Sequence, residues 1–236
     1  MYWLNDRDLC FVALHNQAIK GDAKKNCALY SGVIHLRRDS LAMKQVFAVA
    51  LMVLNFSIFA SAESFKIHAI HKETFSCTEH WTGQFKYTGD ALGTDCVING
   101  WYEDETRLFP VKFRGDGLKN EDWYGFEKEV LAPCNCIVVK VHINGVTNQP
   151  GIMNPGRASS ITFKDDSDNY VLLAHVRNVS VKEGDKVTRG KVVAKVGNNG
   201  YSRNPHIHIG AWDKDGKPLQ IQFDQTTLAL LDREAS

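Results

Sequence analysis

From residue 105 to residue 212 the chain repeats one pattern: short runs rich in Val, Ile and Phe, separated by Gly, Asn, Asp and Pro. Such runs have the length and the β-branched composition of strands, and the residues between them favour turns. No run of three helical turns occurs before the segment QTTLALLDREA near the C-terminus. We therefore predict an all-β fold, an antiparallel β-sandwich or barrel-like sheet with long loops. The expected strands are TRLFPVKF, EVLAPCNCIVVKVHI, ASSITF, NYVLLAHV, KVVAKVG and HIHIGAW.

The N-terminal part of the chain follows a different pattern. Met43 is followed by Lys44, by an apolar run from Val46 to Ile58 and by the small residues at 60–62. This is the layout of a secretory signal peptide, with cleavage expected after residue 62. The apolar run is short for a bilayer, so we predict no stable membrane span. The alternative is a soluble tail followed by a membrane anchor.

These patterns divide the chain into five expected segments. We interpret 1–42 as a non-native extension from a misassigned start, 43–62 as the signal peptide and 63–104 as the N-terminal segment of the mature chain. The main domain is expected at 105–223 and a C-terminal tail at 224–236. We accordingly expect a secreted or periplasmic protein.

The charge of the chain is close to balanced. The whole chain has a formal net charge of +1, and the part after residue 62 has a net charge of about −2. There is no basic stripe, and the aromatic residues are not interleaved with Lys and Arg. These features argue against a nucleic-acid partner.

Four cysteines follow residue 62, and an oxidising compartment permits disulfides between them. Four cysteines allow three pairings. We favour a Cys77–Cys96 bridge. A Cys134–Cys136 bridge would be strained, because neighbours on one face of a strand lie too far apart for ordinary disulfide geometry.

The segment SRNPHIHIGAW holds two histidines on an expected strand. Residues two apart on a strand face the same side, so His206 and His208 point together while Ile207 and Ile209 face the core. A His-x-His pair alone is weak evidence, since exposed strand histidines are common. His175 lies in another expected strand, which strengthens the case for a shared site.

A carboxylate completes the set that we expect. Asp122 precedes the strand expected to begin at Glu129. Imidazole and carboxylate groups brought together from separate strands match the donor set of a catalytic zinc site, which keeps one coordination position open for water.

Taken together, these segments resemble the M23 (LytM/lysostaphin-like) zinc metallopeptidases over roughly residues 115–212. The sequences that carry the resemblance are Ala174-His175-Val176, the segment 181–197 (an expected hairpin with a Gly-Asp turn), Asn198-Asn199-Gly200 and Pro205-His206-Ile207-His208. The upstream run EVLAPCNCIVVKV is similar to a family strand, with Cys136 in place of the usual Gly.

The resemblance implies roles for individual residues. His208 corresponds to a zinc ligand, and His206 and His175 correspond to the catalytic pair, which activates water and stabilises the oxyanion. Asp122 fits the Asp of the family's His-x-x-x-Asp element, but Leu118 stands where its His is expected.

Several explanations of this departure remain open. The third ligand can come from Glu121, Asp116 or His80, the metal can be weakly bound or a different ion, or the domain can bind without cutting. A rival site uses both thiols, Cys134 and Cys136, with His206 and His208 as a closed Cys2His2 zinc centre. Trp123, Tyr124 and Asn199 are further candidates for lining the groove.

The resemblance implies a secreted or periplasmic zinc metalloendopeptidase whose substrates and partners are peptidoglycan peptides. Its cofactor would be Zn2+, and the reaction would be hydrolysis of peptide cross-links. The alternative is a non-catalytic LytM-like domain that binds cell wall or regulates another hydrolase.

Overall fold

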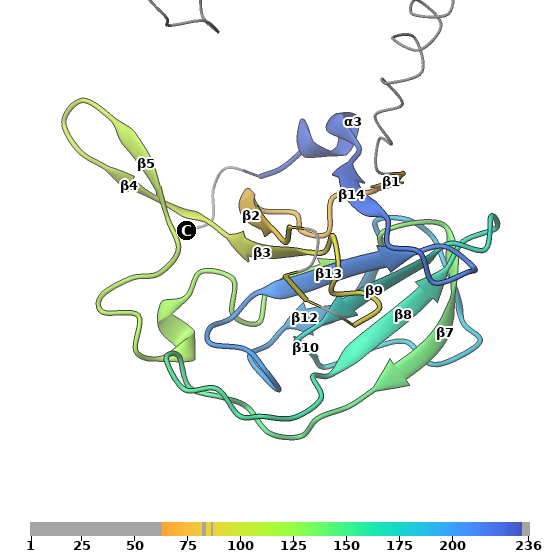
Figure 1. Ribbon diagram of the computed structural model, residues 1–236. Helices are drawn as coiled ribbons and strands as arrows, with labels where there is room; N and C mark the ends of the chain where they lie inside the picture. Colours follow the sequence, from red (N-terminus) through yellow and green to blue (C-terminus); the bar gives the residue numbers. More distant parts are fainter. Residues whose placement is uncertain (1–62, 82–83, 86, 233–236) are drawn as a thin grey trace, which may run out of the picture. The chain divides into compact units, whose positions relative to one another are not determined.

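The computed structural model describes residues 63–81, 84–85 and 87–232. The expectations for 1–42 and 43–62 lie outside this part of the chain. Within it, the only helices are the 3-10 helix η1 (Asn120–Asp122) and the four-residue helix α3 (Gln225–Leu228), and the other regular elements are strands (Figure 1). The prediction of an all-β fold is therefore confirmed. No helix in the described ranges has the length and apolarity needed to cross a membrane.

The largest sheet has seven strands in the order β11-β7-β8-β9-β13-β3-β2, and every neighbouring pair is antiparallel. In chain order its strands are β2 (Phe75–Glu79), β3 (Thr94–Ile98), β7 (Cys136–His142), β8 (Ser160–Lys164), β9 (Tyr170–Ala174), β11 (Lys186–Val187) and β13 (Ile207–Trp212). Strand β13 therefore lies between β9 and β3, well inside the sheet (Figure 1).

Three smaller sheets complete the fold. A three-stranded sheet joins β10 (Val176–Arg177), β12 (Val192–Val196) and β6 (Glu129–Leu131). Strand β1 (Ser64–Ile67) pairs in parallel with β14 (Gln220–Phe223), and β4 (Gly100–Glu103) forms a hairpin with β5 (Leu108–Val111).

The segment 181–197 does not form the expected hairpin. Strand β11 pairs with β7, whereas β12 pairs with β10 and β6. The prediction failed because local turn residues indicate a change of direction but do not determine which strand accepts the hydrogen bonds.

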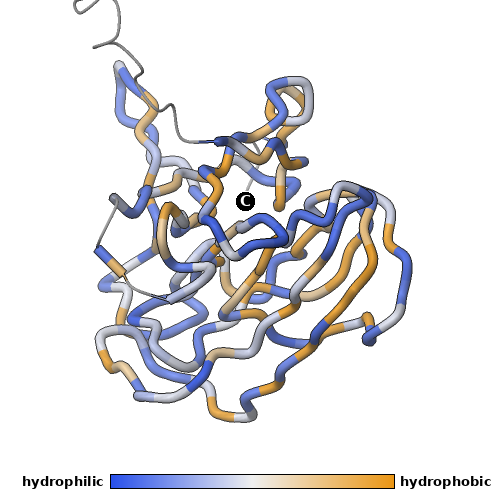
Figure 2. The backbone as a smooth tube through the Cα atoms, turned by 45° about the vertical axis from the view of Figure 1, so that its right-hand side comes forward, coloured by the Kyte–Doolittle hydropathy of each residue, from blue (hydrophilic) through white to orange (hydrophobic). Residues whose placement is uncertain are grey.

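One buried apolar cluster draws side chains from both larger sheets. Phe163 and Ile209 of the seven-stranded sheet and Val130 and Val193 of the three-stranded sheet are all 0% exposed. In Figure 2 hydrophobic colouring follows the strands, and hydrophilic colouring is concentrated in the connections. Ile207 and Ile209 belong to this core, so the predicted inward face of β13 is confirmed.

Two disulfides are present among the described residues. Cys77–Cys96 is confirmed, because these residues lie directly opposite each other in the β2–β3 ladder with their Cα atoms 4.1 Å apart. Cys134 and Cys136 are also joined by a disulfide, against the expectation from strand spacing that this bridge would be strained. Residues 133–135 form a bend before β7 begins at Cys136, and this bend brings the two Cα atoms to 5.4 Å.

Candidate metal centre and histidine cluster

The register of three strands places two histidines and one aspartate on one face of the large sheet. His208 lies opposite Asp95 in the β13–β3 ladder, and Asp95 lies opposite Thr78 in the β3–β2 ladder. His80 is two residues beyond Thr78, just past the end of β2, so its side chain falls on the same face. The backbone N–H of His80 donates to the Gly93 carbonyl at 2.8 Å and extends the pairing to this point.

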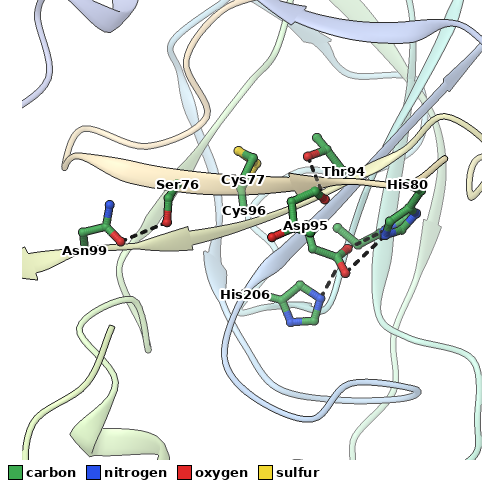
Figure 3. The surroundings of a disulfide bond; sticks show 10 residues. Ser76, Cys77, His80, Thr94, Asp95, Cys96, Asn99 and His206 are labelled. Atoms are coloured by element: carbon green, nitrogen blue, oxygen red, sulfur yellow. Dashed lines mark hydrogen bonds and ion pairs between the residues drawn. A yellow bond between two sulfur atoms is a disulfide. The ribbon is translucent and has the colours of Figure 1, made fainter. Parts of the chain in front are cut away.

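Asp95 is the centre of this group. Its Oδ1 lies 2.9 Å from Nδ1 of His208, and its Oδ2 lies 3.3 Å from Nε2 of His80. Figure 3 shows the Asp95 carboxylate directed at His80 and His206, next to the Cys77–Cys96 disulfide. The potential ligand atoms of His80, Asp95 and His208 all lie within 4.8 Å of one another, and no other such group of His, Cys, Asp or Glu occurs in the described ranges.

The electrostatics of the metal-free group reflect these contacts. Burial acts to lower the pKa of His208, but hydrogen bonds and charges from Asp90 and Asp95 outweigh it and raise that pKa to about 9. Burial acts to raise the pKa of Asp95, but His206 and His208 hold that pKa well below its usual range. A cation is therefore favoured beside Asp95.

The donor set fits a zinc ion. Two imidazoles and one carboxylate are ligands that catalytic zinc uses, and three protein ligands leave a position for solvent. The Nδ1–H of His80 donates to the Asp90 carbonyl at 3.0 Å, which leaves Nε2 with its lone pair beside Asp95. Nε2 of His208 lies 3.1 Å from the Gly89 carbonyl, which directs Nδ1 toward Asp95. Ring nitrogens held in this way are typical of metal-ligating histidines.

His175 and His206 form a second pair next to the metal group. Their ring centroids are 4.5 Å apart, and Nε2 of His206 lies 3.6 Å from Oδ1 of Asp95. His175 donates its Nδ1–H to the Asn199 carbonyl at 2.8 Å, and His206 donates its Nδ1–H to the Asn204 carbonyl at 2.8 Å. In both rings Nε2 is thus the nitrogen left for chemistry.

His175 also has an unusual backbone. It lies between β9 and β10 with a φ of 64°, a left-handed conformation that costs a non-glycine residue conformational energy. Burial, followed by the charge of His206, lowers the pKa of the His175 side chain well below its usual value. The ring is therefore neutral near pH 7.

Buried asparagines hold the loop that carries these hydrogen-bond acceptors. Asn148 donates through Nδ2 to the carbonyls of Gly200 and Ser202, at 2.8 and 2.9 Å. Asn199 binds the backbone on both sides of its amide, accepting from Ser159 and donating to Val176. The expected groove residue Asn199 is thus buried, and its carbonyl orients His175.

Asp122 is not a member of the metal group. It ends η1, where its Oδ2 accepts a hydrogen bond from the Lys119 backbone N–H at 3.0 Å. Leu118, at the expected histidine position, is 64% exposed. Asp116 accepts from the Leu118 backbone, and Glu121 is exposed within η1. Of the proposed substitutes, His80 is the one that the structure brings to His208.

The remaining candidates have structural contacts. Trp123 donates to the Gly117 carbonyl and packs on Phe113, with ring centroids 5.0 Å apart. Tyr124 is partly buried against the core. The Cys2His2 alternative is wrong, because Cys134 and Cys136 are joined in a disulfide and offer no thiolate.

Sequence reasoning missed Asp95. The signal was present, because a Cys77–Cys96 pair on adjacent strands places Asp95 opposite Thr78, and therefore on the face of His80. The predicted Cys77–Cys96 disulfide thus already implies the β2–β3 register that brings Asp95 to His80.

Comparison with known proteins gives a family match that includes His175, His206 and His208 but not His80 or Asp95. Residues 124–221 match the family model "Peptidase family M23". A curated relative, an "Uncharacterized metalloprotease" of Buchnera aphidicola subsp. Baizongia pistaciae (strain Bp), is 24% identical over 111 residues. That match covers 47% of this chain and 28% of the relative, so the chain spans about a quarter of the relative's length.

The solved structures to which this chain is similar include two catalytic domains. A mutant catalytic domain of the prophage-encoded M23 protein EnpA from Enterococcus faecalis has 18% identity, covering 68% of this chain and 94% of that chain, with a TM-score of 0.41. The catalytic domain of lysostaphin from Staphylococcus simulans has 16% identity, covering 66% and 92%, with a TM-score of 0.38. A complex of SpoIIIAH and SpoIIQ has 17% identity, covering 65% and 95%, with a TM-score of 0.42.

Proposed function

Residues 124–221 of this chain belong to peptidase family M23, and from that premise we propose that the protein is a zinc metalloendopeptidase that hydrolyses peptide cross-links of peptidoglycan. The observation that carries the proposal is the convergence of His80, Asp95 and His208, with ligand atoms within 4.8 Å, beside the His175–His206 pair. Leu118 stands where a histidine ligand was expected. We propose that His80 and Asp95, which precede the matched region, supply the ligands in its place.

The proposed roles follow from which nitrogen of each ring is free. His80, through Nε2, and His208, through Nδ1, would hold the ion together with the Asp95 carboxylate. When bound, zinc supplies Lewis acidity that acidifies water and polarises a carbonyl. These roles replace Asp122 by Asp95 in the ligand set and retain His208.

The second pair supplies acid–base chemistry. His175 is neutral near pH 7, and its Nε2 lone pair accepts a proton from the attacking water, because Nδ1–H is already bound to Asn199. His206 donates its Nδ1–H to the Asn204 carbonyl, so only its doubly protonated ring carries an Nε2–H. In that form Nε2–H can donate a hydrogen bond to the developing oxyanion or pass its proton to the leaving amine. The rings are 4.5 Å apart, so both can contact one substrate carbonyl.

The setting of this chemistry is also a proposal. The signal-like segment 43–62 and the two disulfides support export to an oxidising compartment, where peptidoglycan is accessible. We propose that the protein acts in the periplasm or outside the cell.

A pair of variants tests the proposal. His208→Ala removes a ligand and should abolish both stoichiometric zinc and the release of new amino groups from isolated peptidoglycan. His206→Ala should keep the zinc and lose the cleavage, because His206 handles protons and does not bind the ion. Zinc is counted per purified chain, and cleavage is measured on the same samples.

The outcomes separate the candidate functions. A wild-type protein that holds zinc but releases no amino groups would favour the non-catalytic LytM-like alternative. Loss of zinc in His206→Ala would contradict the division of roles between the two histidine pairs.

A further inference from the structure

A short loop between β2 and β3 covers the outer side of the metal group. We name residues 87–93 the Asp90 loop. The Asp90 N–H donates to the Tyr87 carbonyl at 3.0 Å, and the Gly93 N–H donates to the Asp90 carbonyl at 3.2 Å. These two bonds form consecutive turns with Asp90 at their junction, so the position of Asp90 is set by the backbone on both sides.

Glycines let this loop lie directly on the strand that carries His208. A Cβ at Gly210 would overlap the Gly89 carbonyl, and a Cβ at Gly93 would stand 2.8 Å from the Ile209 carbonyl oxygen and 3.0 Å from Cε1 of His208. Gly89 itself has a φ of +91°, which a side chain would strain. The close approach of the loop to β13 therefore depends on the absence of side chains at these positions.

Asp90 contacts both histidines of the metal group. Its backbone carbonyl accepts the Nδ1–H of His80 at 3.0 Å. Its side-chain Oδ1 lies 3.2 Å from Nε2 of His208, a nitrogen that it shares with the Gly89 carbonyl at 3.1 Å. One residue thus binds the outer nitrogen of each ring, through the main chain for His80 and through the carboxylate for His208.

The two nitrogens of an imidazole point away from each other across the ring. Asp90 and Asp95 therefore lie on opposite sides of His208, since Asp95 is 2.9 Å from Nδ1. A metal held by Asp95, His80 and Nδ1 of His208 cannot also bind at Nε2, where Asp90 sits. Asp90 also lies outside the group whose ligand atoms are within 4.8 Å of one another.

We infer that Asp90 is the positioning residue of the metal centre: it orients His80 and His208 with one backbone and one side-chain contact, and so raises their affinity for zinc. This inference rests on the proposed function only in assuming a divalent metal at this group. A carboxylate behind a ligating histidine fixes the ring and increases the electron density on the nitrogen that faces the metal, and loss of such a partner costs roughly 10–100-fold in affinity.

The test measures zinc binding by the metal-free full chain in competition with a chelator. Asp90→Asn keeps the shape and the backbone carbonyl but removes the negative charge, and Asp90→Ala removes the side-chain contact altogether. We expect Asp90→Asn to weaken zinc binding and Asp90→Ala to weaken it by about 10–100-fold. Asp166→Ala, in the exposed turn between β8 and β9, is the control and should bind zinc like the wild type.

A second measurement separates positioning of the metal ligands from a merely structural role of Asp90, which would lower the stability of the metal-free protein without changing the stabilisation by zinc. The metal-free Asp90→Asn protein should melt below the metal-free wild type, because it loses the ion pair between Asp90 and protonated His208. If Asp90 positions the ligands, zinc should also raise the melting temperature of the wild type by more than it raises that of Asp90→Asn. The absorption spectrum of the cobalt-substituted protein should also change in Asp90→Ala, because the ligands shift.

Each contrary result overturns the inference in its own way. Equal zinc affinity in wild type and Asp90→Ala removes the positioning role. Loss of binding in Asp90→Asn as complete as in Asp95→Asn would make Asp90 a ligand. A wild type that binds no zinc would refute both inferences, whereas zinc binding without cleavage would leave the role of Asp90 standing and refute only the peptidase.

Discussion

The Cys77–Cys96 disulfide encloses two of the three proposed metal ligands, which leads to a quantitative prediction. The bridge closes a loop with a sequence separation of 19, and both His80 and Asp95 lie inside that loop. Replacing both cysteines by alanine opens the loop without introducing a polar group. The double variant Cys77→Ala/Cys96→Ala should therefore weaken folding and metal binding together.

The expected loss follows from chain entropy. Releasing a loop of this length costs about 3 kcal/mol of folding stability at room temperature. For a domain of this size each kcal/mol shifts the melting temperature by about 2–4 °C, so we expect a fall of about 6–12 °C. If half of this free-energy loss destabilises the arrangement of His80 and Asp95 that binds zinc, the zinc affinity should drop about tenfold.

The assay compares thermal melting of the metal-free proteins and zinc affinity by chelator competition, under oxidising conditions. The matched control is Cys134→Ala/Cys136→Ala, whose bridge has a sequence separation of 2 and encloses no proposed ligand. It should lose less stability and keep its zinc affinity. A Cys77→Ala/Cys96→Ala variant that melts within about 2 °C of wild type, a shift that corresponds to about 1 kcal/mol or less, and that binds zinc equally well would refute the reasoning.

Two further predictions concern buried polar groups. His71 is 1% exposed, and burial lowers its pKa to about 4, so between pH 6.5 and 4 the unfolded chain binds a proton that the folded protein does not. The free energy of unfolding should fall by about 3 kcal/mol as the pH drops through this window. In His71→Asn, the free energy of unfolding measured by urea titration should depend less steeply on pH. The same pH dependence in His71→Asn and wild type would contradict the assignment to His71. Asn148→Ala removes two hydrogen bonds to the loop beside His175 and His206, and it should cost about 2–3 kcal/mol and lower kcat more than it raises KM. Equal stability and kcat would show that the loop is held by other contacts.

Much of the fold could be predicted from local pattern. The alternation of branched apolar and polar residues predicted β13 and its inward face. The structure confirms both, since Ile207 and Ile209 are 0% exposed. The same pattern could not show that β11 and β12 join different sheets, since pairing depends on distant strands. The strand-spacing argument also failed for Cys134 and Cys136, because the bend at residues 133–135 breaks the extended geometry that it assumed.

The candidate site divides in the same way. His175, His206 and His208 lie in short motifs whose spacing is visible in the chain, and all three meet in the structure. Asp122 was chosen because a carboxylate was expected a few residues after a histidine position, but its carboxylate caps η1 instead. Asp95 and His80 are separated from His208 by more than a hundred residues, so no local spacing could connect them.

By itself, the amino-acid sequence determined the β-rich character of the chain, the inward and outward faces of its strands and the histidines available for chemistry, because these depend on residue type and on a period of two. Only the tertiary structure decided which carboxylate meets them. That choice depends on the β2–β3–β13 register, which long-range hydrogen bonds and the Cys77–Cys96 bridge set, and which places Asp95 between His80 and His208.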